Sequence, residues 1–462
     1  MTIASNTRLT ELTGQTRQPA VAGYFYPADA ATLRQNIRDL LARVSMIADP
    51  PKALIAPHAG YSYSGPIAAT AYASLTSIRH KIRRVVLLGP AHRQFVRGAA
   101  VPTDEYFATP LGRIRIDGKL RTRISGLKQV EINDAAFRNE HSLEVHLPFL
   151  QTVLEDFSLL PILVGDASAD EIAQLLQEVW GGDETLIVVS SDLSHYHDYA
   201  TACRLDNETS LAIRDLQYTR IGPANACGCR PLHGLLQLSG DKNFTVEILD
   251  LRNSGDTAGA RDRVVGYGAY ALYPPTAIRR HHEPLLMTIT STSIRQGLTT
   301  GRPTLPDLSS LPPSFTTPAA VFVTLQIDNN LRGCIGNTEP VSPLATAVAT
   351  NSWNAAFRDP RFPPLSAAEY ERIDIGISVL SEKSPLQFDS EQALLDQLIP
   401  GSSGLVIARG SCRAIFLPSV WENITEPQEF LSRLKQKAGI GRDEMVEQAW
   451  TYTTRSFYGR PD

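Results

Sequence analysis

The segment Ile55-Ala56-Pro57-His58-Ala59-Gly60-Tyr61-Ser62-Tyr63-Ser64-Gly65 decides how we interpret the first half of the chain. Residues 52–55 form a short apolar run bounded by prolines, which predicts a buried strand. His58 follows this run, and residues 67–73 are typical of a helix. A histidine at such a strand-to-helix junction lies where α/β proteins collect ligands and catalytic groups.

Two further apolar runs end in the same way. Residues 84–88 lead through Gly-Pro to His92, and residues 185–189 lead to Asp192 and His195. Nearly continuous apolar strands indicate a largely parallel sheet that is covered on both faces. Since the carboxyl ends of parallel strands lie at one edge, we expect these side chains to meet His58 in a metal site. Taken singly, each histidine could instead be a capping or core residue.

Length and charge limit the class of protein. The chain has 462 residues and a formal net charge of −4, which predicts two or three domains and no basic field for nucleic acid. Residues 1–19 are predicted to be a flexible tail without a signal peptide. No apolar run approaches the roughly 20 residues of a membrane-spanning helix. Five scattered cysteines indicate a reducing compartment, so we expect a cytoplasmic protein that binds neither membrane nor nucleic acid.

The segment 139–150 has a high density of ionisable groups, among them His141, Glu144 and His146. His141 and Glu144 are three residues apart and could share a helix face. A solvated helix face would explain the same pattern.

The segment 225–234 contains two cysteines, Cys227 and Cys229. They are badly placed to form a disulfide with each other, but either thiolate could bind a metal. A buried cysteine without a ligand is the alternative.

The composition divides the chain into two parts. Residues 20–274 form the predicted metal-binding domain, and residues 275–283 are a linker rich in proline and charge, where we expect His281 and His282 to be solvated. Residues 284–458 begin with a helix and contain two predicted hairpins. We therefore expect an α/β domain followed by a smaller α+β domain.

Both parts resemble known families. Residues 20–273 resemble the Memo family, and residues 284–458 resemble the AMMECR family. The Memo-type stretches are Ala56-Pro57-His58-Ala59-Gly60-Tyr61, Leu88-Gly89-Pro90-Ala91-His92, Glu140-His141-Ser142-Leu143-Glu144-Val145-His146-Leu147-Pro148, Ser190-Ser191-Asp192 and Cys227-Gly228. The AMMECR-type stretches are Leu331-Arg332-Gly333-Cys334-Ile335-Gly336 and Asp359-Pro360-Arg361-Phe362-Pro363-Pro364-Leu365. The whole chain resembles a fusion of AmmeMemoRadiSam system proteins B and A, which are associated with a radical SAM protein.

The Memo resemblance implies a fold and a ligand set. Its fold is that of class III extradiol dioxygenases, a three-layer α/β domain with a central mixed, mainly parallel sheet, whose non-haem iron is held by two histidines and a carboxylate. The resemblance implies His58, His92 and Cys227 as ligands of iron, with copper or zinc as alternatives. Cys229 stands where many relatives have a basic residue, which adds a second thiol. A thiolate in place of the carboxylate alters the charge and redox tuning of iron.

The AMMECR resemblance directs attention to a pocket formed by Arg332, Cys334, Asp359 and Arg361. Cys334 could be a nucleophile or a small core residue. Residues 285–462 contain no histidine that could activate it as a base, which favours the core.

Two functions follow from these patterns. The first is a metal-dependent, dioxygenase-like oxidoreductase with Asp192, His195 and His141 as acid/base groups. Glu144, His146 and Cys229 would surround the metal or replace a ligand. The second is a non-catalytic metal- or ligand-binding scaffold. The oxidoreductase would act with the radical SAM protein on an unknown small-molecule or protein substrate. The scaffold would use its pocket for recognition, or would hold a small molecule or protein side chain that the radical SAM protein itself modifies.

Overall fold

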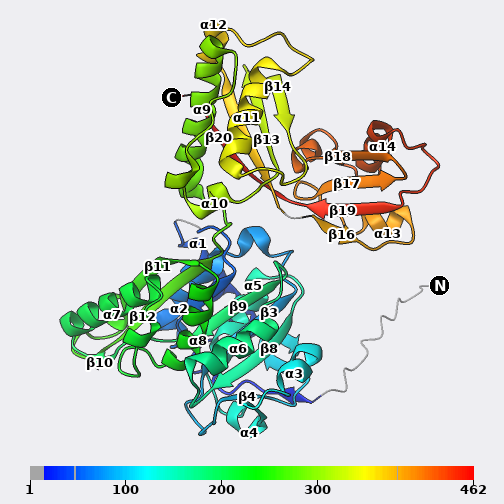
Figure 1. Ribbon diagram of the computed structural model, residues 1–462. Coiled ribbons are helices and arrows are strands. Elements are labelled where there is room, and N and C mark those ends of the chain that lie inside the picture. The colour runs from blue at the N-terminus through cyan, green and yellow to red at the C-terminus, as the bar shows by residue number, and fades with distance from the viewer. Residues whose placement is uncertain (1–14, 46–47, 382, 462) are drawn as a thin grey trace, which may run out of the picture. The chain divides into compact units, whose positions relative to one another are not determined.

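A computed structural model describes residues 15–45, 48–381 and 383–461 (Figure 1). The chain divides into two compact units between Pro275 and Thr276, and each is considered by itself. A nine-stranded mixed sheet organises the first unit. Its strands lie in the order β10 (His195–His197), β12 (Val264–Tyr273), β2 (Ala53–Ala56), β9 (Thr185–Ser190), β3 (Arg84–Pro90), β8 (Ser158–Val164), β4 (Ala99–Val101) and β7 (Val130–Ile132), with β11 (Thr245–Asn253) also beside β12.

The four central strands β2, β9, β3 and β8 are parallel to one another. The strands that flank them, β12 and β4, run antiparallel to their neighbours β2 and β8. Both faces of the central strands are covered: Ile55 and Leu88 belong to one core, and the alternate residues Leu54 and Leu87 are equally buried on the opposite side. This double burial explains why these strands appear in the sequence as unbroken apolar runs.

Helices form the two outer layers of the first unit. Figure 1 shows α6 and α8 crossing one face of the sheet. They pack together with α3, whereas α1, α2 and α5 pack with one another and α7 packs on β11 and β12. The helices are α1 (Ala30–Ala42), α2 (Tyr61–Ala73), α3 (Gly118–Ile124), α4 (Asp134–Phe137), α5 (Leu147–Val153), α6 (Ala169–Val179), α7 (Tyr199–Arg214) and α8 (Cys229–Asp241), with short 3-10 turns η1 (Thr76–Ile78), η2 (Glu144–His146), η3 (Tyr218–Arg220) and η4 (Ser254–Asp256). The predicted three-layer α/β architecture is confirmed.

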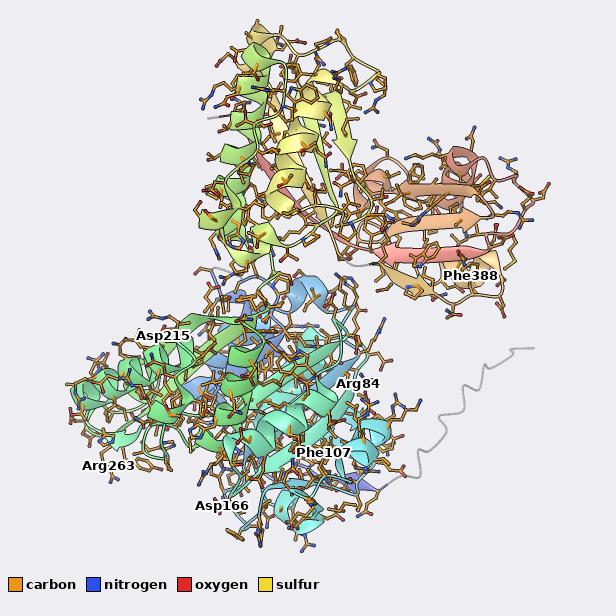
Figure 2. All side chains as sticks on the ribbon, viewed as in Figure 1. Arg84, Phe107, Asp166, Asp215, Arg263 and Phe388 are labelled. Atoms are coloured by element: carbon orange, nitrogen blue, oxygen red, sulfur yellow. The ribbon has the colours of Figure 1, made fainter. Side chains whose placement is uncertain are left out.

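The N-terminal segment differs from the predicted flexible tail. Residues 1–14 lie outside the described residues, but β1 (Thr16–Arg17) pairs with β5 (Tyr106–Thr109), which also pairs with β6 (Gly112–Arg115). Arg17 is buried, with Nη1 2.8 Å from Glu144 Oε2. Its guanidinium lies 5.2 Å from the ring centre of Phe107, which is labelled in Figure 2. The segment is polar, but one of its polar residues, Arg17, is buried and attaches residues 15–17 to the first unit.

The second unit contains two four-stranded antiparallel sheets. The first has the order β14 (Asn330–Gly336), β13 (Val321–Ile327), β15 (Asp374–Leu380) and β20 (Thr454–Gly459). The second has the order β16 (Ser384–Leu386), β19 (Gln448–Tyr452), β17 (Gly404–Arg409) and β18 (Cys412–Phe416). The helices are α9 (Glu283–Thr300), α10 (Pro313–Thr316), α11 (Leu344–Phe357), α12 (Ala367–Tyr370), α13 (Glu391–Leu395) and α14 (Pro427–Ala438), with η5 (Arg280–His282), η6 (Leu308–Ser310) and η7 (Pro418–Glu422). The predicted α+β character is confirmed.

The predicted linker is partly ordered. Residues 274–279 have no regular secondary structure, but η5 and the first residue of α9 occupy its second half. His282, expected to be solvated, is only 8% exposed and packs edge-on against Phe315, with ring centres 5.3 Å apart. Burial against an aromatic ring explains the difference.

Candidate metal centre

Three adjacent strand ends place the predicted site residues at one edge of the large sheet. β9 lies between β2 and β3, and the three strands are parallel. His58 follows the end of β2, His92 follows β3 and Asp192 follows β9. The backbone N–H of His58 donates a hydrogen bond of 2.8 Å to Asp192 Oδ1. The structure thus brings these three residues together at the predicted place.

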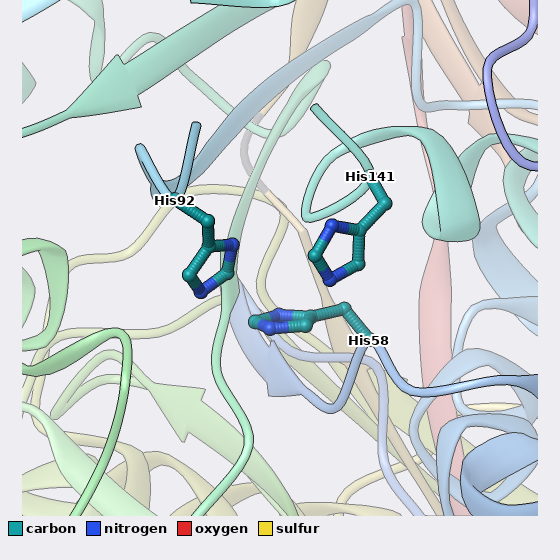
Figure 3. Close-up of side chains that lie close together, drawn as sticks. All are labelled: His58, His92 and His141. Atoms are coloured by element: carbon teal, nitrogen blue, oxygen red, sulfur yellow. The ribbon is translucent and has the colours of Figure 1, made fainter. Parts of the chain in front are cut away.

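A third histidine joins this edge. One ring nitrogen each of His58, His92 and His141 lies within 4.8 Å of the other two, the one such group among the described residues (Figure 3). The His92 and His141 rings are stacked, with centres 5.0 Å apart, and His58 lies edge-on to both. His141, which the sequence suggested as an acid/base group, therefore has the position of a further metal donor.

Glu140 orients two of these histidines. Its carboxylate accepts hydrogen bonds from the backbone N–H groups of His92 (2.6 Å), His141 (2.9 Å) and Ser142 (2.9 Å), and lies 3.0 Å from His92 Nδ1. Burial alone would raise the pKa of Glu140, but the hydrogen bonds and the charge of His92 lower it to about 2. A charged carboxylate at Nδ1 keeps the proton there and leaves Nε2 of His92 as the donor for a metal.

The proton of His58 is placed by a chain of hydrogen bonds. The Ser190 hydroxyl donates its proton to the Ser142 carbonyl (2.6 Å), so it can only accept from His58 Nδ1, which is also 2.6 Å away. His58 therefore carries its proton on Nδ1 and has a lone pair on Nε2. Burial, followed by the nearby charges of His92 and His141, lowers the pKa of His58 well below its usual value. A neutral imidazole with this tautomer is the form that binds metals.

Cys227 lies beside the histidine cluster. Its Sγ is 3.4 Å from His58 Nε2 and accepts a 3.3 Å hydrogen bond from the backbone N–H of Asp192. Burial and the charge of Asp192 raise the pKa of this thiol. A cation at the histidines would oppose this effect by favouring the thiolate. Gly228 permits the close approach, because a Cβ there would lie 2.5 Å from the carbonyl oxygen of Ser190.

Two of the predicted acid/base groups, Asp192 and His195, lie near His58. Asp192 is buried, and its Oδ2 is 3.9 Å from His58 Nε2. Burial raises the pKa of Asp192, while the hydrogen bond from His58 and the charge of His195 oppose this effect. His195 begins β10 and is partly exposed. Both groups therefore stay within electrostatic reach of the cluster.

Three other predicted residues have structural contacts. Glu144 accepts hydrogen bonds from Arg17, from Tyr26 and from two backbone N–H groups of the N-terminal segment. His146 Nδ1 is 2.7 Å from the Tyr72 hydroxyl, and burial lowers the pKa of this histidine to about 3. Cys229 is buried in the hydrophobic core on the α8 side of the sheet. None of the three is in the cluster of His58, His92 and His141 in the described chain.

The donor set fits a transition metal. Imidazole and thiolate are common ligands of iron, copper and zinc. Metal–nitrogen bonds are about 2.0–2.1 Å for zinc, so ring nitrogens within 4.8 Å of one another can converge on one ion after small side-chain rotations. The Nδ1 atoms of His58 and His92 already have fixed partners, as histidine ligands usually do.

The predicted pocket of the second unit is held together by its own ion pairs. β14 is an edge strand, and the N–H of Cys334 donates to Asp359 Oδ2 (2.8 Å) while Arg361 Nη2 donates to the Cys334 carbonyl (3.2 Å). Hydrogen bonding to Arg361 holds the pKa of Asp359 well below its usual range. Arg332 binds Glu369 (2.8 Å). These pairings leave both arginines less available to an anion than the sequence suggested.

Two cationic side chains, Arg361 and Lys437, lie near Cys334. Thr324 Oγ1 donates to its Sγ at 3.3 Å. Burial lowers the pKa of Lys437 on α14, and the charge of Cys334 opposes this effect while Arg361 adds to it. Lys437 and Arg361 thus lie within electrostatic range of Cys334. The choice between nucleophile and core residue for Cys334 stays a prediction.

Comparisons with known proteins agree in both units. The family model described as Memo-like protein matches residues 17–271, and the AMMECR1 model matches residues 287–457. The chain is 36% identical over 266 residues to a MEMO1 family protein of Methanosarcina barkeri, covering 55% of this chain and 98% of that protein. It is also 36% identical over 269 residues to a MEMO1 family protein of Aquifex aeolicus, covering 54% and 97%. An uncharacterized protein from Pyrococcus horikoshii matches with 28% identity and a TM-score of 0.36, covering 39% of this chain and 93% of that one.

No helix in the described part of the chain is both long and apolar enough to span a membrane.

Proposed function

Because the chain belongs to the Memo family and also carries an AMMECR1 domain, we propose that its first unit is a non-haem metal centre, with iron as the first candidate. His58 and His92 are the proposed histidine ligands, and Cys227 is the third ligand that the resemblance implies. His141 is a fourth donor in reach. The observation that supports this proposal is the convergence of three ring nitrogens within 4.8 Å, beside a thiol.

The proposed activity is dioxygenase-like or another oxidation, carried out with a radical SAM protein in the cytoplasm. When bound, iron would supply redox and Lewis-acid chemistry. Asp192 and His195 are the proposed acid/base groups. Burial raises the pKa of Asp192, which brings this carboxyl closer to the pH at which it can exchange a proton with a substrate.

The alternative is a non-catalytic metal-binding scaffold for the same partner. Two observations favour it. Cys227 brings a thiol to the position beside the histidines, where the dioxygenases of this fold use a carboxylate. The nearby carboxylate, Asp192, is engaged by the backbone N–H of His58, and so is less available as a ligand.

Metal analysis under anaerobic conditions tests the site. We expect one metal ion per chain in the wild-type protein and in a His80→Ala control, because His80 is a partly buried histidine away from the cluster. His58→Ala and His92→Ala should each lose it. Retention of metal in both variants would refute the centre. Oxygen uptake with catechols then separates the two functions, because a scaffold holds metal without consuming oxygen.

A further inference from the structure

A cavity lined by arginines lies away from the histidine cluster in the first unit. Its volume is about 490 Å³, and its walls come from α1, from the hairpin β5–β6 and from the end of α5 with the loop that follows. Four arginines line it: Arg34, Arg38, Arg113 and Arg115. The three histidines of the candidate metal centre are not among its lining residues, so the cavity is distinct from that centre.

Secondary structure directs the arginines to this cavity in two pairs. Arg34 and Arg38 are one turn apart on α1, beside the buried stripe that includes Leu33 and Ile37. Arg113 and Arg115 are two residues apart on β6, so they project from the same face of the strand. One helix face and one strand face therefore present their cations to a common space.

Three of the four arginines have no acidic partner among the described residues. Arg34, Arg38 and Arg115 have no ion pair or hydrogen bond with any described residue, and Arg113 lies over the Tyr106 ring, 5.4 Å from its centre. Two carboxylates also line the cavity, but one of them, Glu155, is paired with Arg79 at 3.3 Å. The cavity thus keeps an excess of positive charge in a protein whose net charge is −4.

A hydrogen bond connects two walls of the cavity, α5 and the β5–β6 hairpin. Gln151, from α5, donates a 3.2 Å hydrogen bond to the carbonyl of Gly112 at the hairpin turn. Gly112 has a φ of +129°, a conformation that suits glycine. This hydrogen bond holds β6, which carries Arg113 and Arg115, against the end of α5. Because the hairpin is fixed there, a ligand would meet a largely preformed site.

We propose that this cavity binds a multiply charged organic phosphate of about nucleotide size. Guanidinium groups bind phosphate oxygens in a bidentate manner, and arginine is the usual residue for such recognition. A volume of about 490 Å³ is in the range of small-molecule sites. The two arginine pairs suit a ligand with two linked phosphates, and the aromatic rings of Tyr106 and Phe157 in the lining suit its organic part.

Calorimetric titration of the full chain with ADP tests the proposal. We expect saturable binding of one ADP. In Arg38→Gln/Arg115→Gln, affinity should fall by about tenfold or more, because charged hydrogen bonds to the phosphates are lost from both arginine pairs. The control Arg204→Gln/Arg220→Gln removes the same charge from exposed positions on α7 and η3 and should leave the affinity within about twofold.

One further variant and two further ligands distinguish specific phosphate recognition from nonspecific electrostatic attraction of anions. Arg115→Lys keeps the charge but not the planar fork, so an intermediate loss supports bidentate recognition. Adenosine should not bind, and citrate should bind more weakly than ADP. The proposal is overturned if wild-type protein shows no saturable binding at millimolar ADP, if the two double variants lose affinity equally, or if citrate binds as well as ADP.

Discussion

Replacing Glu140 with glutamine tests how the candidate metal centre is held in place. The substitution keeps the size of the side chain but removes its charge. It also replaces one acceptor oxygen with an NH₂ group, which would face N–H donors. The carboxylate now accepts from the backbone N–H groups of His92, His141 and Ser142 and meets His92 Nδ1. We expect both metal affinity and stability to fall.

The magnitude follows from the pKa of Glu140. Its change from 4.5 to about 2 on folding corresponds to about 3 kcal/mol. This is an upper value, because part of the change comes from His92 in its charged form. Since the folded-state pKa is the lower one, this stabilisation is fully present above about pH 4.5 and is lost as the pH falls through about 2. Loss of a residue that orients ligands typically lowers metal affinity by about 10- to 100-fold.

Two measurements check this prediction. Urea unfolding of metal-free protein should show Glu140→Gln to be less stable than wild type by up to about 3 kcal/mol at pH 7, with the difference shrinking below pH 4.5. Competition with a chelator gives the metal affinity. Glu131→Gln on β7 is the control, because its carboxylate accepts a hydrogen bond from Asn133 and from no other residue in the described part of the chain. Wild-type metal affinity in Glu140→Gln would refute the orienting role.

Three further predictions concern ligands and architecture. His58→Ala and His92→Ala should each abolish stoichiometric metal binding while the circular dichroism spectrum stays native; a loss of fold in both would make the metal data uninformative and contradict the expectation. Cys227→Ser should weaken metal binding by about one to two orders of magnitude, whereas Cys229→Ser, in the core, should change it little; the reverse ranking would exclude Cys227 as the ligand. Limited trypsin digestion should cut first within 275–283, and the N-terminal fragment should retain all the metal; stoichiometric metal in the C-terminal fragment would refute the two-module interpretation.

The sheet edge was predictable because its determinants are local. Each of the strands β2, β3 and β9 is a short apolar run, and parallel strands place their carboxyl ends together whatever the rest of the chain does. His58, His92 and Asp192 needed only this rule. The candidate donors Cys227 and His141 needed more, because no periodic pattern specifies how an irregular segment turns back to the edge.

The role of Glu140 could not be predicted from the sequence. It stands directly before His141 in a segment dense with ionisable groups, and this density was the available signal. Its role depends on a contact with His92, 48 residues away. In the same way, polar composition suggested a tail at Arg17, whose partner Glu144 is 127 residues away. Pairings between distant polar groups leave no trace in local composition, so helix and strand patterns cannot reveal them.

The pairing of Asp359 and Arg361 with the backbone of Cys334 has a consequence for folding in the cell. An edge strand with unpaired N–H and C=O groups is a template onto which a strand of another chain can add. The segment that carries Asp359 and Arg361 occupies both groups of Cys334, and its prolines cannot donate to a further strand. This segment therefore covers part of the exposed edge, and we expect substitutions within it to lower the yield of folded protein through aggregation, in addition to any effect on the predicted pocket.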